Sequence, residues 1–448
     1  MGIESVRVKN FKNLKNSTIN FRSNISGIYG PNGTGKTAIV EAINIISLYF
    51  KSKKSKKSLH SLNSKIKQLM SIGQNTTEIE IVLEKNKFLY KLIVEFKKDN
   101  EGNIYTSKEE LSFKKVNSRA VYKHIAIIEN GLEEIIPKFY LGSKKEEFSN
   151  EIEKKILAKK ELYLKNLLLE FNNFNSYISL VFKYSKDIDL PNLSEELSLF
   201  LLHWENLNQL LETIVVVTLK EQALYNLDIL LPLQVHNEKI HGNLFVNYGE
   251  NNNVYDEKIA FQLQQIIEQI GDIFSVIIPD SKLYLEKEIV KVENELKKVA
   301  LNIYIKRDGK KISIEKESTG IVKLVSLLSA LIFYVQDENA IVVVDELDIH
   351  IFEYLLATLL EKLSKHAKGQ LIFTAHNLLA LEKLNKNSII ISSKSDKDII
   401  YTYFKNTSKT TNLRQKYLRS QNLWSEDNIE PLLLNESALE MYLKKLVK

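Results

Sequence analysis

The sequence predicts an α/β fold, because three stretches each join a short hydrophobic strand to polar residues. Residues 25–29 are typical of a short strand, which is followed by a glycine-rich loop and then by an apolar-periodic helix. Residues 340–344 are five apolar residues in a row that lead into two acids. Residues 370–377 form a further apolar run that ends in polar groups. Such runs suit strands that are buried on both faces of a parallel sheet.

The glycine-rich loop is GPNGTGKT, residues 30–37, and it fits the pattern G-x-x-x-x-G-K-[ST] at every required position. Its glycines allow backbone N–H groups to surround an anion, and the helix N-terminus adds positive potential. Lys36 would reach the β- and γ-phosphates of ATP, and the Thr37 hydroxyl would ligate Mg²⁺. A fortuitous glycine-rich turn is the alternative, but the strand–loop–helix context argues against it. The predicted phosphate-binding residues are Asn32, Gly33, Thr34, Gly35, Lys36 and Thr37.

Acidic residues follow the second strand, where a nucleotide hydrolase needs them. Asp345 would hold Mg²⁺ through its water shell, and Glu346 would polarise the attacking water. The third strand leads to His376, whose imidazole could hydrogen-bond the γ-phosphate or hold the same water. An acidic strand end at a sheet edge and a merely packed histidine are the structural alternatives. We interpret Glu346 and His376 as candidate catalytic residues and Asp345 as a candidate metal ligand.

Composition places the chain among ordinary soluble globular proteins. Its 448 residues are 44% hydrophobic and 26% charged, which allows two or three domains or one domain with a large insertion. Cysteine is absent, which excludes disulfides, thiolate metal sites and a cysteine nucleophile. The N-terminus lacks a signal-peptide core, and no apolar run reaches the roughly 18 residues of a membrane span. We therefore expect a cytoplasmic protein that does not contact a membrane.

The net charge of +6 comes mainly from lysine, and one lysine run is dense enough to suggest a ligand. Residues 51–57, KSKKSKK, contain five lysines. They could contact the phosphates of DNA, which is a candidate partner on this ground, or they could form a solvated loop. The sequence leaves both interpretations open.

Hydrophobic periodicity divides the chain into three parts. Alternation across residues 77–115 predicts antiparallel strands, which complete an N-terminal ATPase lobe over residues 1–148. Helical spacing from about 149 to 231, and again over 259–274, predicts a helical insertion over residues 149–275. Asp308-Gly309 predicts a tight hairpin turn. We expect residues 276–448 to form the C-terminal ATPase lobe.

Three motifs together resemble those of a known class: GPNGTGKT near the N-terminus, DE after a hydrophobic strand, and a TAHN-type histidine on the next strand. They are similar to the ABC-type ATPase heads of the SMC, RecF, RecN and OLD group. The resemblance implies an α/β P-loop NTPase fold of ABC-ATPase type, a two-lobed mixed sheet, here with a helical insertion. The opening VRVKNFKNLKNSTINF resembles the N-terminal strand pair of these heads, which implies that Asn10, Phe11 and Lys12 lie near the adenine.

Heads of this class carry a signature loop that opens a helix and meets the γ-phosphate of the opposite protomer. Here residues 317–321, ESTGI, stand about 25 residues before the acidic pair and precede an apolar helix. Ser318 as the helix N-cap and Gly320 for close approach fit that place. The resemblance therefore implies an ATP-tightened homodimer, or a higher assembly of such dimers. The sequence lacks the LSGGQ of transporter subunits, and it offers no clear Q-loop glutamine.

Within this class, the short insertion and the TAHN strand look most like those of AAA-family ATPase subunits from prokaryotic anti-phage (abortive-infection) systems. That likeness implies a protein that hydrolyses ATP and controls a separate effector such as a nuclease. Two alternatives stay open. One is a DNA-repair or maintenance ATPase of RecF or SMC type that acts on DNA, and the other is an ATP-locked scaffold with little turnover.

Overall fold

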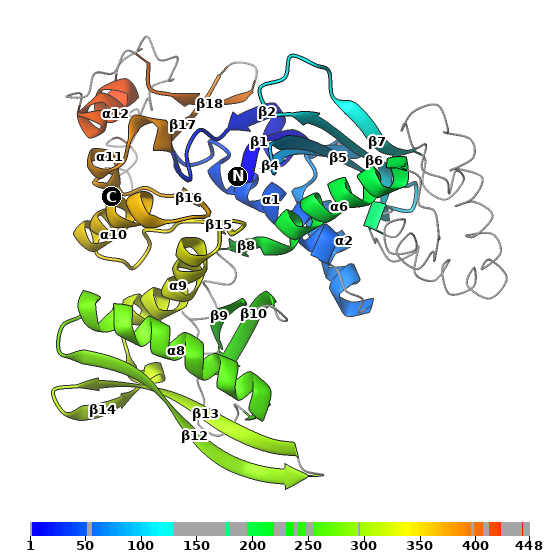
Figure 1. Cartoon of the computed structure of the whole chain (residues 1–448). Helices are drawn as coiled ribbons and strands as arrows, with labels where there is room; N and C mark the ends of the chain where they lie inside the picture. Colours follow the sequence, from blue (N-terminus) through cyan, green and yellow to red (C-terminus); the bar gives the residue numbers. More distant parts are fainter. Residues whose placement is uncertain are drawn as a thin grey trace.

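The structure is a computed structural model, and it describes residues 2–51, 56–129, 176, 178–179, 195–218, 230–236, 241–247, 254–293, 296–395, 398–405, 412–422 and 441. Figure 1 shows three bodies of β-structure: an antiparallel sheet at the top right, a mixed sheet at the centre and a smaller unit at the bottom. Residues 52–55 of the lysine run, and the side chains of the whole run, lie outside the described part, so its role stays a prediction.

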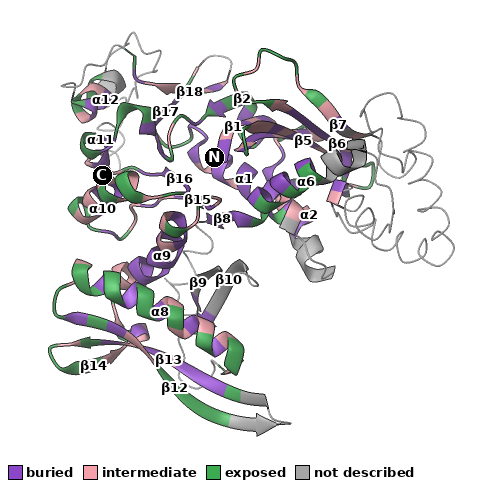
Figure 2. Cartoon of the chain, viewed as in Figure 1, coloured by how far each residue is buried: buried purple, intermediate pink, exposed green. Residues whose placement is uncertain are grey.

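The central sheet has six strands in the order β18-β17-β3-β16-β15-β8, and all neighbours are parallel except β17 and β18. Alternate side chains of its strands enter two separate hydrophobic clusters, one shared with α1 (Lys36–Lys51) and one with α9 (Thr319–Gln336). Both faces are therefore covered, which explains the continuous apolar runs and confirms the predicted strands (Figure 2). The strands are β3 (Ile25–Tyr29), β8 (Ile214–Val217), β15 (Ile341–Val344), β16 (Gln370–Thr374), β17 (Ile389–Lys394) and β18 (Ile399–Tyr403).

The antiparallel sheet has the order β2-β1-β4-β5-β6-β7, and its inner face packs on α1 and α6 (Glu195–Thr213). Alternating side chains such as Val6, Val8, Ile79 and Ile81 are fully buried on that face. The antiparallel strands predicted over residues 77–115 are confirmed. The strands are β1 (Gly2–Phe11), β2 (Leu14–Asn20), β4 (Thr76–Lys85), β5 (Phe88–Lys98), β6 (Ile104–Lys115) and β7 (Lys123–Glu129), and α2 (Lys56–Leu69) lies beside them.

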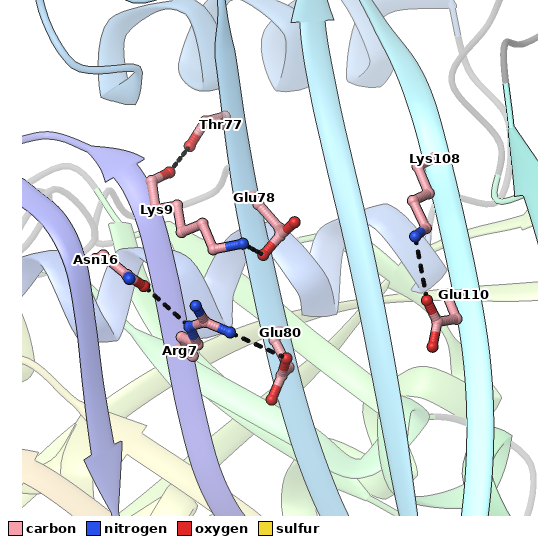
Figure 3. A network of polar contacts seen from close by, with 8 residues as sticks. All are labelled: Arg7, Lys9, Asn16, Thr77, Glu78, Glu80, Lys108 and Glu110. Carbon is pink, nitrogen blue, oxygen red and sulfur yellow. Dashed lines mark hydrogen bonds and ion pairs between the residues drawn. The ribbon is translucent and has the colours of Figure 1, made fainter. Parts of the chain in front are cut away.

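The outer face of this sheet carries a ladder of charged side chains that largely neutralise one another (Figure 3). Lys9 Nζ lies 2.6 Å from a Glu78 carboxylate oxygen across the β1–β4 pair. Lys108 Nζ lies 3.2 Å from the Glu110 carboxylate on β6. Opposite charges on neighbouring strands, such as Lys9 and Glu78, favour the observed pairing of β1 with β4.

The smaller unit joins an antiparallel sheet to a long amphipathic helix, α8 (Glu257–Ile277), and connects to the central sheet through α9. A hairpin at Asp308-Gly309, with φ of +50° and +75°, joins β13 to β14 as predicted. A separate two-stranded hairpin packs on α9. The strands of this unit are β9 (Leu230–His236), β10 (His241–Asn247), β11 (Val254–Asp256), β12 (Ser281–Glu293), β13 (Leu296–Arg307) and β14 (Lys310–Ser313).

The remaining described helices are short or lie beside the central sheet. They are α10 (Glu353–His366), α11 (Ala380–Lys383), α12 (Leu413–Asn422) and two 3-10 turns, η2 (Ile314–Lys316) and η3 (Lys386–Ser388). By length and composition, α9 alone among the described helices could cross a membrane, but 67% of it is buried inside the protein.

The segment between residues 149 and 275 differs in part from the predicted helical insertion. Within it α6 and α8 are helices, but residues 214–217, IVVV, form the edge strand β8 of the central sheet. β9 and β10 form an antiparallel hairpin, which the sequence analysis did not predict. The β-branched run pairs in parallel with the equally β-branched β15, so tertiary pairing overrides the helical spacing that surrounds it. Most of residues 149–194 lies outside the described part.

Polar contacts of Gln370 and Asp398 help to join the antiparallel sheet to the central sheet. The Gln370 side chain at the start of β16 accepts from the Ile3 N–H at 2.7 Å and donates to the Ile3 carbonyl at 2.8 Å, and both contacts are buried. The Asp398 carboxylate accepts the backbone N–H groups of Lys15 and Asn16 at the start of β2. The N-terminal strands are thereby fixed to the sheet that carries the P-loop.

We predict that Gln370→Leu destabilises the protein by about 2–4 kcal/mol, because it leaves the buried Ile3 N–H and carbonyl without partners. Urea denaturation followed by circular dichroism measures the change in unfolding free energy. Gln265→Leu, on the exposed face of α8, is the matched control and should change it little. Equal unfolding free energies for Gln370→Leu and the wild type would contradict the role of this link.

Candidate active site

The P-loop runs from the end of β3 into α1, and close packing requires glycine at two of its positions. A Cβ at Gly30 would lie 2.3 Å from the backbone oxygen of Ser392 on β17. Gly35 has a φ of +75°, and a Cβ there would lie 2.7 Å from the side chains of Leu14 and Tyr401. These contacts give the loop the tight course that a phosphate cradle needs.

Strands β17 and β18 hold the P-loop from behind. The Thr34 and Ser392 hydroxyls share a hydrogen bond of 2.7 Å, and the Tyr401 hydroxyl donates to the Gly35 carbonyl at 2.9 Å. Burial raises the pKa of Tyr401, so its hydroxyl remains a donor at neutral pH. Sequence analysis missed Ser392 and Tyr401, because neither belongs to a local motif and only the sheet order brings them to the loop.

Lys36 begins α1, and its ammonium group lies over the P-loop. The residue is 7% exposed, and Nζ donates to the carbonyls of Gly30 at 2.7 Å and Pro31 at 3.0 Å. Burial lowers the pKa of Lys36, while the carboxylates of Glu346 and Asp345 act in the opposite direction. A cation held at the loop carbonyls is placed to contact a phosphate group.

Thr37 and Asp345 meet at the end of the central sheet although 308 residues separate them. The Thr37 hydroxyl donates to Asp345 Oδ1 at 3.3 Å, and Asp345 is 1% exposed. Hydroxyl and carboxylate oxygens are the donors that Mg²⁺ prefers, so this pair fits the predicted metal. The structure thus brings the two candidate metal ligands together.

Thr374, the last residue of β16, organises both acids. Its hydroxyl donates to Asp345 Oδ1 at 2.6 Å and accepts from the Glu346 N–H at 2.7 Å, and the residue is fully buried. It therefore orients the candidate ligand and fixes the start of the acidic turn, residues 345–350. Sequence analysis gave Thr374 no role, since its position next to the acids depends on the register of β15 and β16.

A pocket of about 260 Å³ lies over the P-loop, and both candidate catalytic side chains line it. Glu346 enters it from the acidic turn with a φ of +47°, a conformation that is uncommon for a residue with a side chain. His376 enters it as an exposed side chain just beyond β16. The lining residues are Lys12, Asn13, Asn32, Gly33, Thr34, Gly35, Lys36, Thr37, Ala38, Glu346 and His376.

Asp348 in the acidic turn holds the backbone of the histidine loop. Its Oδ2 accepts the N–H groups of His376 at 2.8 Å and Asn377 at 2.7 Å. A carboxylate that accepts two backbone N–H groups fixes the loop's position relative to the acids. Asp348 thereby connects the two strand ends that carry the candidate catalytic residues.

The three residues expected near the adenine divide between the pocket and the core. Lys12 lines the pocket and forms an ion pair with Glu41 of α1. Phe11 is 1% exposed and belongs to the hydrophobic core, so its ring is not available to stack on a base, and its expected place near the adenine stays a prediction. Asn10 is not among the residues that line the pocket. Asn13, which sequence analysis missed, lines it and donates from its amide to the Gly33 carbonyl at 2.6 Å.

The signature loop lies apart from this pocket within the chain. Ser318 is the N-cap of α9, as predicted, and its hydroxyl accepts from the Ile321 N–H at 3.4 Å. A Cβ at Gly320 would lie 2.6 Å from the His350 carbonyl oxygen, so this glycine allows α9 to approach the acidic turn. Neither Ser318 nor Gly320 is among the residues that line the pocket over the P-loop.

The fold and this geometry define a P-loop ATPase domain of the ABC-like, mixed α/β type. A family model described as an AAA ATPase domain matches residues 1–380, and the chain belongs to this family. A comparison with curated proteins finds no match.

Three solved Smc head domains are similar to this chain at low sequence identity. The SMC head domain from Thermotoga maritima is 15% identical, with 90% of this chain and 100% of that chain covered and a TM-score of 0.41. The Smc head domain from Pyrococcus furiosus, bound to the C-terminal domain of ScpA, is 17% identical, with 95% and 100% covered and a TM-score of 0.43. The Smc head domain from Pyrococcus yayanosii is 14% identical, with 94% and 100% covered and a TM-score of 0.45.

We predict that Thr374→Val lowers kcat for ATP hydrolysis by about 10–100-fold, because it removes the hydrogen bonds that orient Asp345 and the Glu346 peptide. Phosphate release at saturating ATP and Mg²⁺ gives kcat. Thr77→Val is the matched control: Thr77 is also buried and hydrogen-bonded, but to Lys9 in the antiparallel sheet. A kcat loss of the same size in both variants would indicate a general structural defect and not a role at the acids.

Proposed function

We propose that the protein is an ATP-hydrolysing switch that closes as a homodimer and controls a separate effector. One observation carries the proposal: a single pocket gathers the P-loop, Glu346 and His376 above the Thr37–Asp345 pair. Lys36 and the loop amides would bind the β- and γ-phosphates, and Thr37 and Asp345 would hold Mg²⁺. When bound, Mg²⁺ would neutralise charge on these phosphates. Glu346 would polarise the attacking water, and His376 would hold it or contact the γ-phosphate.

The position of the signature loop supports the homodimer. Ser318 is exposed and stands at the N-terminus of the long helix α9, where backbone N–H groups favour an anion. Within one chain it does not line the pocket over the P-loop. A second copy placed face to face would bring its own Ser318 and Gly320 to that pocket, and by two-fold symmetry the reverse contact would form as well. ATP shared across both contacts would tighten the dimer.

The resemblance of the motifs to ATPase subunits of anti-phage systems supports a place in phage defence, with a separate nuclease as the effector. A DNA-repair role and a scaffold role make different predictions for turnover. Hydrolysis that rises several-fold with added DNA would favour the repair role. Tight ATP binding with almost no phosphate release would favour the scaffold role.

We predict that Glu346→Gln keeps ATP affinity but lowers kcat by about 100-fold or more, because the amide keeps the shape and cannot polarise water. The variant should also accumulate as an ATP-bound dimer in size-exclusion chromatography. Glu353→Gln, an exposed position at the start of α10, serves as the control and should retain wild-type turnover. Wild-type kcat in Glu346→Gln would move the catalytic role elsewhere, with His376 the first residue to examine.

The composite site is tested by mixing two inactive variants. Ser318→Arg and Lys36→Ala should each lack activity. The Ser318→Arg side chain would block the partner's site, and Lys36→Ala removes the cation from the P-loop of its own chain. Mixed in equal amounts they should recover about a quarter of the wild-type rate, since half of the dimers are heterodimers with one intact site out of two. ATP hydrolysis is measured before and after subunit exchange. Full activity of Ser318→Arg alone would contradict a site shared between protomers.

A further inference from the structure

Helix α9 carries one lysine, Lys323, and its side chain is buried against the acidic turn. The residue is 3% exposed, and Nζ donates to the Glu346 carbonyl oxygen at 3.0 Å. Lys323 is not among the residues that line the pocket over the P-loop. From α9, which we also call the signature helix because the signature loop opens it, Lys323 therefore contacts the backbone of a candidate catalytic residue without lining the pocket over the P-loop.

The contact completes a set of hydrogen bonds on the Glu346 peptide groups. The Glu346 N–H donates to the Thr374 hydroxyl, while its carbonyl accepts from Lys323 and, at 3.3 Å, from the Ile349 N–H. The left-handed φ of +47° at Glu346 costs free energy, and such conformations persist where the surroundings over-determine them. Lys323 supplies the one side-chain donor to that carbonyl among the hydrogen bonds of the described residues.

The same helix touches the far end of the acidic turn. The absence of a side chain at Gly320 allows α9 to pack directly on the His350 carbonyl. Ser318, the N-cap, stands five residues before Lys323, which corresponds to about 7 Å along a helix that rises 1.5 Å per residue. A helix is stiff over this length, so a displacement of Ser318 also displaces the group that holds the Glu346 carbonyl.

Lys323 places an amine at a buried position beside three carboxylates. Burial lowers the pKa of Lys323 to about 8, while the carboxylates of Asp348, Glu346 and Asp345 act in the opposite direction. An apolar side chain of similar volume would be accommodated in a buried helix face at a lower desolvation cost. The amine therefore stabilises the acidic turn by its hydrogen bond to the Glu346 carbonyl and by its attraction to the nearby carboxylates.

We propose that Lys323 is a positioning residue for ATP hydrolysis, which holds the Glu346 peptide in its left-handed conformation and couples it to the signature helix. The inference rests on the proposed ATPase function. In a face-to-face dimer, Ser318 of one protomer contacts the γ-phosphate at the second site. Lys323 allows that contact to change the rate of hydrolysis at the first site, because both residues belong to one helix.

The test compares Lys323→Met with the wild-type full-length chain. The thioether keeps the volume but cannot donate, so we expect kcat to fall by about tenfold or more while the Kd for a fluorescent ATP analogue stays within about twofold. Lys323→Arg keeps the charge and the donors, and it should recover part of the lost kcat. Thermal unfolding of each variant shows whether the fold is retained.

Lys85→Met is the matched control, because Lys85 is also buried and its Nζ donates to Gln209 at the antiparallel sheet. Its kcat should equal that of the wild type. Wild-type kcat in folded Lys323→Met would overturn the proposal, as would an equal loss of kcat and ATP affinity. If Lys323→Met does not fold, a kcat of Lys323→Leu at the wild-type level would overturn it in the same way, because leucine also lacks a donor. Absence of hydrolysis by the wild type would instead reject the ATPase function itself.

Discussion

The parallel pairing of β3, β16 and β15 is the constraint on which the candidate active site depends. Thr374 pairs with Ile28, and Val344 pairs with Phe373, so three strands reach the same edge of the sheet in register. The carboxyl ends of parallel strands converge on one edge, which is where α/β folds bind ligands. A one-residue slip of β15 would exchange its two buried faces and remove Asp345 from Thr37. The hydrophobic clusters on both faces therefore set the geometry of the metal ligands.

Around that edge, buried polar groups are connected to one another. The Thr374 hydroxyl donates to Asp345 and accepts from the Glu346 N–H, and the Asp348 carboxylate accepts from the His376 N–H. In a low-dielectric interior these hydrogen bonds are stronger than in water, so they fix the orientation of the groups that they join. The acidic turn, the histidine loop and the start of α9 are consequently one structural unit. A shift at any of these segments reaches Glu346.

The P-loop, the acids after a hydrophobic strand and the histidine can each be recognised within eight residues of sequence, and the structure brings them together at one pocket. The sequence did not reveal those positions and contacts that depend on a distant partner. Phe11 alternates into the core, which only the register of β1 with its neighbours reveals. β8 is a strand because it pairs with β15, where Ile214 lies opposite Ile341, a residue 127 positions later in the sequence. Tyr401 and Lys323 likewise reach the site through tertiary packing, which no pattern of spacing encodes.

The balance of charge at the acidic turn explains why two buried lysines approach it from different elements. Asp345, Glu346 and Asp348 place three carboxylates close together, and such a cluster would repel a triphosphate. Lys36 faces them from the P-loop and Lys323 from α9, and burial lowers the pKa of both amines while the carboxylates oppose that shift. Lys36 is the cation that the phosphates would engage when they enter the pocket. Lys323 is held at the Glu346 carbonyl and remains close to the same carboxylates. Through Lys323, α9 affects the electrostatic potential of a pocket that Lys323 does not line.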